Sequence, residues 1–499
     1  MDAYAITMDH EAVAEALATG SIMPDQVADD APEAAVTGFW NIEFQTFYMD
    51  APAFMLAGAG DVAVIEGETA EAALAAAGEV LDYSVDSGDY QILRAVPCDE
   101  PEPEAEIEPV YPEIGIETTV RDLRAALAAC GKIVGAGGHA IPILHCVLFD
   151  ASESSVTVTG TDLDCTVTAE MPVSAASAGQ CAVNFKELRK CLTKRPVGEA
   201  VTILADGTAS RVTVTVGMAQ HVLTAFGPGD WPRPVAVDSG EIAEIGAADL
   251  HSVLTDVQAA MSSEETRYYL NGALLERGPD DTLQAVATDG HRMHVRSTDV
   301  AWPDMGFAEI DADTDEMVGR KSQVILPRVA VERLAVLTKD SAGDVMVESD
   351  GCRADFVGDG WQVRTKLVDG LYPDWQRVVP DAASRDEIAT VQPGPVADVC
   401  RALGNTAATF RWADAEIRAK QHGSRHGGDF TESVYPLARV NGACALEQIG
   451  MNAHYVGQLM ERFDPDGEAD FRMADAGSPI LVTAAARPEF RAVVMPMRV

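Results

Sequence analysis

Hydrophobic positions recur at helical spacing in six segments, which form three pairs along the chain. The first helix of each pair is predicted at Val120 to Val134, Ala247 to Met261 and Pro395 to Ala408. The second helix of each pair is predicted at Phe185 to Arg195, Pro327 to Leu337 and Asn452 to Phe463. Hydrophobic and polar residues alternate between the helices, which predicts half-buried antiparallel strands at Val212 to Val216, Asp344 to Ser349 and Trp361 to Leu367.

The pairs recur at similar intervals, which indicates an internal repeat. Lys186, Arg328 and Ala453 hold equivalent places in the second helices, 142 and 125 residues apart. Thr161-Asp162 aligns in the same way with Thr288-Asp289, 127 residues further on. We therefore expect three copies of one domain, each with two helices packed on antiparallel sheets in an α+β architecture. The expected domains are residues 116–238, 239–382 and 383–499.

The first 115 residues lie outside the repeat. Residues 1–97 predict a small acidic α+β domain, with helices at Asp9 to Thr19 and Thr69 to Gly78 and strands at Asn41 to Met49, Asp61 to Ile65 and Tyr90 to Val96. Residues 98–115 are rich in Pro and Glu and have no apolar period, so we expect an extended linker there. Nothing in this part of the sequence indicates a role.

Charge and cysteine content limit which classes of protein and which partners the sequence is compatible with. The 499 residues carry a net charge of −43, and residues 1–115 hold 25 of the 79 acidic residues but only one base, Arg94. Strong acidity opposes casual nucleic-acid binding, so a DNA-binding protein of this composition must gather its cations on one face. The chain has no apolar run of 18 residues, no basic leader and no CxxC pair among nine cysteines. We expect a cytoplasmic protein with free thiols, no metal and no cofactor.

Cations gather on the predicted helices. The segment Phe185 to Arg195 carries five cations and a single acid, Glu187. Taken alone, such a helix is most often a solvated face. Cations on equivalent helices of a repeated domain favour another interpretation, which is contact with DNA phosphates. The candidate DNA-binding residues on the helices are Arg121, Arg124, Lys132, Lys186, Arg189, Lys190, Lys194, Arg195, Arg328 and Arg333.

Three other segments carry a resemblance to a known family. They are Ala287 to Met293 (ATDGHRM), Lys366 to Pro380 (KLVDGLYPDWQRVVP) and Val493 to Val499 (VVMPMRV). Together they resemble the bacterial sliding clamp, the β subunit of the replicative DNA polymerase, over residues 116–499. The resemblance implies a homodimeric ring that encircles double-stranded DNA and slides because it contacts phosphates without reading bases. It also implies a clamp-loader ATPase as partner, and neither a catalytic residue nor a cofactor.

The resemblance further implies a hydrophobic cleft between the second and third domains. In the family this cleft receives short linear peptides from the replicative polymerase, the clamp loader and repair polymerases. Aliphatic and Met side chains suit apolar anchors, and His and Arg at the rim orient a peptide. The matching positions are Leu270, Thr288, Gly290, His291, Arg292, Met293, Pro373, Arg377, Val378, Asn452, Tyr455, Val493, Met495, Pro496, Met497 and Arg498. The family also contacts DNA through the loop that here holds Arg267, Tyr268 and Tyr269.

An enzyme is the first alternative. Asp289 and His291 could form an acid–base pair, or His291 and His294 could bind a metal. Residues three apart on a strand diverge, and the sequence contains no GxSxG, HExxH or P-loop motif. Both observations count against an enzyme.

A clamp-related acidic scaffold that does not close into a ring is the second alternative. The helix-to-helix interval of the third unit, Ala397 to Ala453, is shorter than that of the second unit and includes the Gly-rich run Gln421 to Asp429. The second unit carries an acidic insertion near Trp302 to Gly319. In the family the third domain pairs with the first domain of the partner subunit, so the departure in the third unit bears on ring closure. Oligomeric size separates the two interpretations, since a ring requires a dimer.

Overall fold

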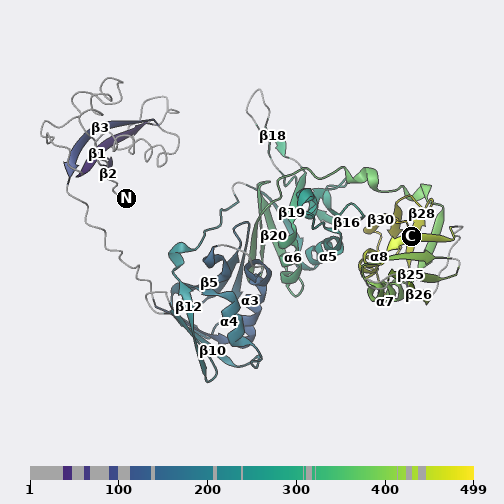
Figure 1. Cartoon of the computed structure of the whole chain (residues 1–499), viewed down its shortest axis with the longest axis horizontal. Helices are drawn as coiled ribbons and strands as arrows, with labels where there is room; N and C mark the ends of the chain where they lie inside the picture. The colour runs from purple at the N-terminus through teal and green to yellow at the C-terminus, as the bar shows by residue number, and fades with distance from the viewer. Residues whose placement is uncertain are drawn as a thin grey trace. The chain divides into compact units, whose positions relative to one another are not determined.

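The computed structural model describes residues 38–47, 61–67, 89–98, 113–135, 141–205, 211–237, 240–306, 308–310, 317–320, 322–412, 414–422, 430–436 and 446–498. The chain divides into two compact units, Met1–Glu108 and Pro109–Val499 (Figure 1). No helix in the described ranges is long and apolar enough to cross a membrane.

The first unit contains one antiparallel sheet in the order β2-β1-β3. Its strands are β1 (Gly38–Phe47), β2 (Asp61–Gly67) and β3 (Asp89–Cys98). All three lie where the sequence predicts strands, with ends shifted by up to three residues. The predicted helices at Asp9 to Thr19 and Thr69 to Gly78 lie outside the described residues, as does most of the predicted linker.

The second unit contains three repeats of one α+β design, as predicted. Each repeat has two four-stranded antiparallel sheets and two helices that lie side by side (Figure 1). In the first repeat, one sheet contains β4 (Ile114–Thr119), β10 (Ala200–Ala205), β11 (Arg211–Val216) and β12 (Ala219–Phe226). The other contains β9 (Gly179–Asn184), β5 (Cys146–Ala151), β6 (Val156–Thr161) and β7 (Cys165–Met171). Its helices are α3 (Val120–Gly135) and α4 (Phe185–Leu192), and the short elements are β8 (Ala175–Ala176), η2 (Pro142–His145) and η3 (Pro228–Asp230).

The second repeat follows the same order. Its first sheet contains β13 (Glu241–Gly246), β20 (Asp344–Ser349), β21 (Arg353–Gly358) and β22 (Trp361–Lys366). Its second sheet contains β19 (Gln323–Pro327), β14 (Gly272–Arg277), β15 (Thr282–Thr288) and β16 (Arg292–Ala301). Its helices are α5 (Ala247–Val257) and α6 (Arg328–Leu337), and its short helical turns are η4 (Gln258–Ala260), η5 (Glu265–Leu270), η6 (Trp375–Val378) and η7 (Ala382–Ser384).

The predicted insertion near Trp302 to Gly319 begins in the core and continues as a hairpin. Trp302 and Met305 are buried, and Ser349 Oγ donates a hydrogen bond to the Met305 carbonyl at 2.9 Å. The hairpin pairs β17 (Ala308–Ile310) with β18 (Met317–Arg320). The start of the insertion is therefore held by core packing.

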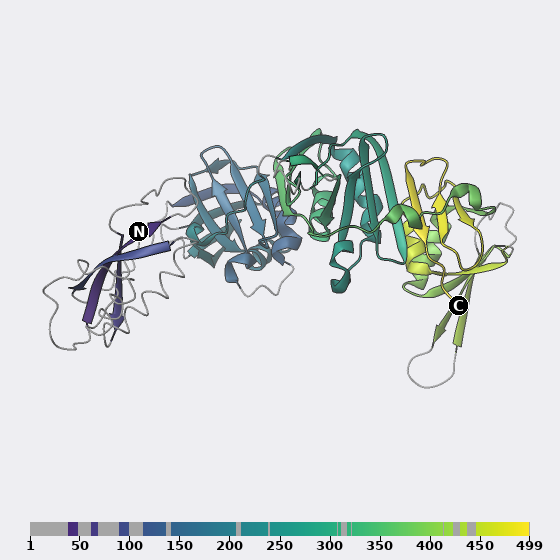
Figure 2. The ribbon, with the colours of Figure 1, turned by 90° about the horizontal axis from the view of Figure 1, so that it is seen from above.

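The third repeat completes the series. Its first sheet contains β23 (Glu387–Val391), β28 (Ala469–Met473), β29 (Ile480–Thr483) and β30 (Phe490–Val494). Its second sheet contains β27 (Gln448–Asn452), β24 (Ala407–Arg411), β25 (Glu416–His422) and β26 (Phe430–Pro436). Its helices are α7 (Pro393–Leu403) and α8 (Ala453–Met460). The hairpin of β25 and β26 projects beyond the rest of its sheet (Figure 2).

Strand pairing joins consecutive repeats at two seams. At the first seam β7 pairs with β22, with Val167 opposite Val363. At the second seam β16 pairs with β30, with Met293 opposite Val493. In both cases the last strand of one repeat's second sheet pairs with the last strand of the next repeat's first sheet. The seams therefore follow one rule.

The helices pack on the sheets through the predicted apolar stripe. On α3 the buried residues include Leu123, Leu127, Cys130 and Val134. Gly160 on β6 allows this close approach, because a Cβ atom there would lie 2.5 Å from a methyl group of Val134. Burial of such side chains from water is the main stabilising contribution.

Helix ends depart from the sequence predictions in four helices, and α4 and α8 each end three residues early, at Leu192 and Met460. The predicted third-repeat helix Pro395 to Ala408 begins at Pro393 and ends at Leu403, because Gly404 takes a positive φ of 65°. The predicted helix Ala247 to Met261 ends at Val257 and continues as η4. Two second helices begin with the same cap, since Asn184 and Asn452 each accept hydrogen bonds from two backbone amides of the first turn.

The repeat extends to a single turn between strands. In the second repeat Thr288 Oγ1 accepts from Gly290 N, and Asp289 Oδ1 accepts from two backbone amides. Thr161-Asp162 in the first repeat forms the same bonds, and so does Ser349-Asp350 in another turn of the second repeat, between β20 and β21. The third residue of each turn has a positive φ: 82° at Leu163, 86° at Gly290 and 89° at Gly351. The alignment of Thr161-Asp162 with Thr288-Asp289 is confirmed, and Leu163 occupies a position where the other copies have glycine.

A charged cluster of Asp256, Arg296, Arg487 and Glu489 links the second and third repeats. Arg487 Nη2 lies 2.7 Å from the buried Asp256 carboxylate, and Arg296 Nε lies 3.5 Å from it. Glu489 contacts Arg296 at 2.5 Å and Arg487 at 3.3 Å. Two cations are thus balanced by two anions at the second seam.

Candidate functional site

The turn between β15 and β16 forms one side of the candidate peptide site. Thr288 Oγ1 donates to the Arg292 carbonyl at 2.7 Å, and Asp289 Oδ1 accepts from the amides of His291 at 2.9 Å and Arg292 at 3.0 Å. A Cβ atom at Gly290 would lie 2.7 Å from Nη1 of Arg267. The positive φ of 86° favours glycine at position 290.

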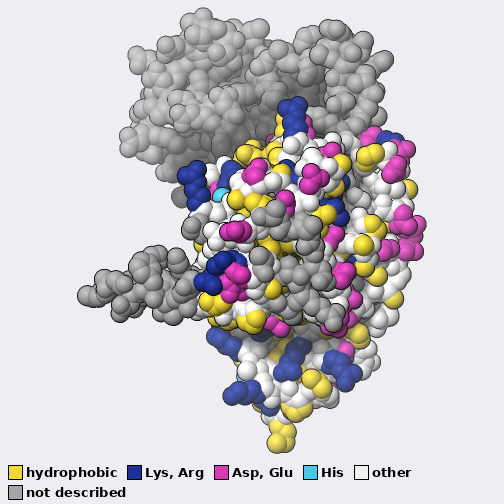
Figure 3. Space-filling model, turned by 90° about the vertical axis from the view of Figure 1, so that its right-hand side faces the viewer, with side chains coloured by type: hydrophobic (Ala, Val, Ile, Leu, Met, Phe, Trp, Pro, Cys, Tyr) yellow, Lys and Arg dark blue, Asp and Glu magenta, His cyan; other side chains and the backbone are white. Residues whose placement is uncertain are grey.

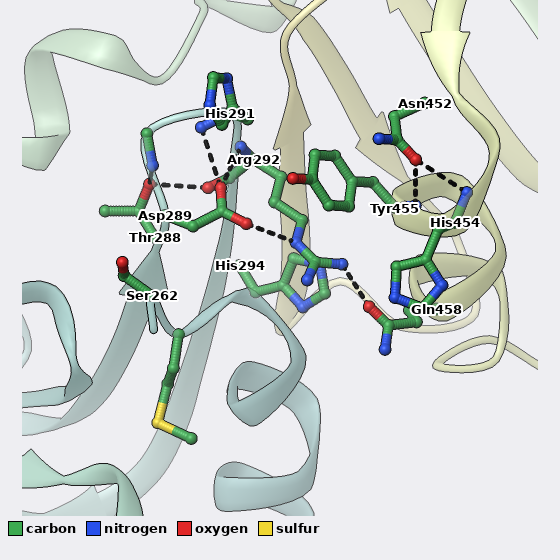
Figure 4. A network of polar contacts seen from close by, with 12 residues as sticks. Ser262, Thr288, Asp289, His291, Arg292, His294, Asn452, His454, Tyr455 and Gln458 are labelled. Atoms are coloured by element: carbon green, nitrogen blue, oxygen red, sulfur yellow. Dashed lines mark hydrogen bonds and ion pairs between the residues drawn. The ribbon is translucent and has the colours of Figure 1, made fainter. Parts of the chain in front are cut away.

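Arg292 joins the turn to the third repeat. Its Nε lies 3.1 Å from Asp289 Oδ2, its Nη1 donates to Gln458 Oε1 at 2.6 Å, and its guanidinium carbon lies 4.3 Å from the ring centre of Tyr455 (Figure 4). Burial lowers the pKa of Arg292, while Asp289 raises it. A guanidinium with these partners keeps its charge and fixes the turn against α8.

Tyr455 and Asn452 supply the other side. The Tyr455 ring stacks on His291 with centroids 6.4 Å apart and an interplanar angle of 21°. Asn452 Oδ1 accepts from the amides of His454 and Tyr455, which fixes the start of α8 beside the turn (Figure 4). The structure therefore brings together residues that are more than 150 positions apart in the sequence.

The C-terminal segment extends the seam past β30. Met495 N donates to the His291 carbonyl at 2.9 Å, and Met497 N donates to the Gly450 carbonyl at 2.8 Å. Met495 and Pro496 are half-buried, whereas Met497 and Arg498 are exposed. The backbone is thus fixed on both sides while Met497 presents its side chain to solvent.

An apolar floor lies under the seam. Leu270, Met293 and Val493 are buried in one cluster with Tyr372 and Trp375. Two segments next to this cluster carry exposed apolar side chains, namely Leu371, Pro373 and Val378 around η6 and Met497 after β30. Leu371 is 74% exposed and was missed by the sequence interpretation, although its place next to Tyr372 and Pro373 was a signal. Arg377 is exposed and pairs with Asp374 at 2.6 Å.

A pocket of about 560 Å³ also opens at this junction. It is lined by His291, Arg292 and Tyr455, together with residues near the ends of α5, α6 and α8. His294 does not share it. Its side chain is fully buried, and its Nδ1 lies 2.7 Å from the Asp256 carbonyl. The predicted divergence of exposed His291 from His294 is confirmed, and no group of three His, Cys, Asp or Glu side chains in the described ranges could hold a metal.

The first repeat carries a basic groove of about 810 Å³ between α3 and α4. Lys132, Lys186, Arg189 and Lys190 line it and are exposed. Among the charged side chains of the face in Figure 3, Lys and Arg predominate in the lower part and Asp and Glu along the right margin. Arg121 and Lys194 are also exposed, and Arg195 is half-buried.

Three of the predicted DNA-contacting arginines donate hydrogen bonds to backbone carbonyls of the fold. Arg333 is 4% exposed and donates to the Ala128 carbonyl of the first repeat at 3.3 Å, so its assignment as a DNA contact is wrong. Arg124 donates to the carbonyls of Leu192 and Arg195, and Arg328 to those of Met261 and Ser262. Charge patterns do not distinguish such cations from free ones, because their partners are backbone carbonyls from distant parts of the chain.

The family loop that holds Arg267, Tyr268 and Tyr269 lies beside the candidate peptide site. Arg267 pairs with Glu264 at 2.6 Å and contacts the position of Gly290. A Cβ atom at Gly370 would lie 3.1 Å from Cβ of Tyr269. Tyr268 is 54% exposed. These side chains therefore surround the turn and the segment before η6.

Two family models match the second unit. The DNA polymerase III beta subunit N-terminal domain matches residues 121–235, and the central domain of the same subunit matches residues 244–374. The beta sliding clamp of Caulobacter vibrioides (strain NA1000 / CB15N) is 26% identical over 379 residues, which covers 72% of this chain and 94% of the relative. The beta sliding clamp of Vibrio cholerae is 26% identical over 368 residues, with the same coverage.

Solved structures agree with these matches. A sliding clamp from Bartonella birtlesii bound to griselimycin superposes with a TM-score of 0.63 at 26% identity, covering 78% of this chain and 100% of that one. The DNA polymerase III beta subunit of Thermotoga maritima has a TM-score of 0.63 at 17% identity, covering 77% and 100% of the two chains. The second likeness concerns the fold alone.

Proposed function

Because this chain belongs to the bacterial β sliding clamp family, we propose that two copies close into a ring around duplex DNA and hold the replicative polymerase on it. Members of this family are processivity factors and perform no catalysis. The ring is the basis of that activity, since a protein held by topology needs no tight grip on its track. We place it in the cytoplasm, with its three clamp domains at residues 116–238, 239–382 and 383–499.

The observation that carries this proposal is the rule of the two seams. Each seam pairs the last strand of one repeat's second sheet with the last strand of the next repeat's first sheet. In the third repeat the corresponding strand is β26, and in the first repeat it is β12. If the same rule applies between two subunits, β26 of each subunit pairs with β12 of the other. A dimer then has two such junctions. The two junctions close a ring by a head-to-tail contact.

Both strands offer an edge for that pairing. β12 bonds to β9 only through Ala225 and Phe226, which leaves Ala219 to Thr224 without a second neighbour among the described strands. Val222 is 64% exposed on β12, and Val434 is 48% exposed on β26. An exposed apolar edge strand tends to pair with another chain. In a monomer this leads to aggregation, whereas in an oligomer it forms a subunit interface. This supports ring closure and counts against an open scaffold.

The basic groove suits sliding along DNA. Lys186, Arg189 and Lys190 are exposed on α4, and Lys132 pairs with Glu332 while remaining largely exposed. Cations of this kind contact phosphates and carry no sequence information. Acidic residues elsewhere repel DNA from the remaining surface, so the charge pattern directs the duplex to one face.

The second seam suits short linear peptides. A floor of Leu270, Met293 and Val493 accepts apolar anchors, and Met497 adds an adaptable rim. A few such anchors dominate the affinity of interfaces of this type. The expected partners are the replicative polymerase, the clamp-loader ATPase and repair polymerases, each through a short peptide.

Sedimentation of the full chain tests ring closure. We expect a particle of about twice 52.9 kDa at micromolar concentration. Val222→Lys on β12 should produce monomers, because a charge on an edge strand opposes pairing. Val197→Lys is the matched control, since Val197 is 52% exposed and lies outside the strands. A monomeric wild-type protein, or a dimer unaffected by Val222→Lys, would count against the ring.

A further inference from the structure

The segments that follow β12 and β22 repeat one another. Asp230-Trp231-Pro232-Arg233 matches Asp374-Trp375-Gln376-Arg377, 144 residues further on. Trp231 and Trp375 are both buried. Trp375 packs with Met293 and Val493 of the second seam, whereas Trp231 packs with Leu148 on β5 and Ala182 on β9 of the first repeat. Arg233 and Arg377 are both exposed. The segment that borders the candidate peptide site at the second seam thus has a counterpart at the first seam.

The first seam has its own pocket, of about 240 Å³. Its lining comes from the turn at Thr161 to Thr166, the segment Pro232 to Val235, and the end of β22 at Arg364 to Lys366. These correspond to the turn at Thr288 to Met293, the segment after Trp375 and the end of β30. The pocket therefore occupies the place of the peptide site, one repeat earlier.

Its chemistry differs from that of the second seam. Arg233, Arg353 and Lys366 line it, with Asp164 as the lining acid. Arg364 also faces it but is paired with Asp355 at 2.5 Å, so its charge is already balanced. At the second seam the end of the strand continues instead into the apolar sequence Val494 to Met497.

Apolar side chains accompany the cations. Leu163 is 57% exposed and Val235 is 61% exposed, and both line the pocket. Leu163 takes a positive φ at the tip of its turn, which aims a large side chain where the other copies have glycine. A cationic pocket with two exposed aliphatic groups fits a ligand that is both acidic and apolar.

We propose that the first seam is a second docking site, which binds a short acidic segment of a partner protein through one apolar anchor. Excess positive charge at this pocket, within a chain of net charge −43, provides the complementarity. A volume of about 240 Å³ accommodates a single Leu or Phe side chain. Duplex DNA is the less favoured occupant, since strand ends and connecting segments form this pocket, whereas the basic groove lies between helices.

A direct binding assay on the full-length protein tests the proposal. The probe is a fluorescein-labelled peptide of sequence Glu-Asp-Leu-Glu-Phe-Glu-Asp, followed by fluorescence anisotropy. We expect Arg233→Glu combined with Lys366→Glu to weaken binding by about tenfold or more, since both cations are exposed at the pocket. Arg377→Glu, the equivalent change at the second seam, should alter it less than about twofold. High salt should weaken binding of the probe.

Three outcomes would overturn the proposal. Unchanged affinity in the Arg233→Glu, Lys366→Glu variant would remove the site. Loss of the probe in Met497→Ala with Arg498→Ala would place the peptide at the second seam. Displacement by a short duplex would assign the pocket to nucleic acid. The analogy rests on the proposed peptide site, yet the two can fail separately, because an apolar peptide tests the second seam and the acidic probe tests the first.

Discussion

Asp256 at the second seam offers a quantitative test of how the repeats are held together. Its carboxylate is buried and contacts Arg487 at 2.7 Å and Arg296 at 3.5 Å. Asp256→Asn removes the negative charge but keeps the shape of the side chain. The positive charges of Arg296 and Arg487 are then neutralised by Glu489 alone. The change acts on the pairing of β16 with β30, which borders the candidate peptide site.

The magnitude follows from what remains after the substitution. Removing one partner of a buried ion pair costs about 3–5 kcal/mol. Glu489 still contacts Arg296 at 2.5 Å and Arg487 at 3.3 Å, and its side chain is 35% exposed. Because Glu489 retains part of the compensation, we expect the free energy of opening the second seam to fall by about 2–3 kcal/mol.

Native-state hydrogen exchange measures that opening locally, which matters because a chain of several domains does not unfold in one step. A loss of about 2–3 kcal/mol should accelerate exchange of the amides between β16 and β30 by roughly 30- to 140-fold. Asp355→Asn is the matched control, since Asp355 is buried and pairs with Arg364 within the second repeat. It should accelerate exchange in β21 and β22 instead. Unchanged exchange at the second seam in Asp256→Asn would refute the reasoning.

Three further predictions concern particular side chains. Burial lowers the pKa of His294 to about 3, whereas an unfolded imidazole titrates near 6.5, so the unfolded chain binds the extra proton between these values. The free energy of unfolding should therefore fall as pH drops from about 6.5 toward 3, by up to ~1.4 kcal/mol per pH unit. His294→Gln should remove that part of the slope in urea titrations, and identical slopes would contradict the assignment. Leu163→Gly should relieve about 1–2 kcal/mol of backbone strain at the positive φ of the folded turn. Glycine also makes the unfolded chain more flexible, which costs about 0.5–1 kcal/mol of stability. Because the first contribution is larger, Tm should rise slightly. A clear fall in Tm would show that the Leu163 side chain stabilises the turn. Met497→Ala with Arg498→Ala should abolish binding of a polymerase-derived peptide in an anisotropy assay while sedimentation still shows a dimer. Undiminished peptide affinity would show that the C-terminal segment is not part of the peptide-binding site.

Local patterns predicted much of the fold. All six helices and the three named strands of the repeats lie at the expected places, because apolar periodicity identifies amphipathic elements directly. The turn at Thr288-Asp289 and its copy at Thr161-Asp162 are bonded alike. Gly404 explains why α7 ends earlier than predicted, since a positive φ ends a helix.

Long-range polar contacts could not be predicted. Arg333 lies on the buried face of α6 and donates a hydrogen bond to the Ala128 carbonyl, which is 205 residues away in the sequence. Arg487 meets Asp256 across 231 residues. Charge patterns along a sequence do not identify such partners, so a structural arginine was assigned to DNA. The candidate peptide residues were found through a resemblance in three separated segments, while exposed Leu371 was missed although it lies next to Tyr372 and Pro373.

Retention on circular and linear DNA tests the central claim most directly. The full chain is loaded onto a nicked circular plasmid with a clamp-loader ATPase, and gel filtration measures the protein that stays with the DNA before and after a restriction enzyme opens the circle. Enclosure predicts retention on the circle and rapid loss from the linear form, with Lys190→Glu combined with Lys194→Glu lowering retention on the circle at moderate salt. Equal loss from both forms would contradict it.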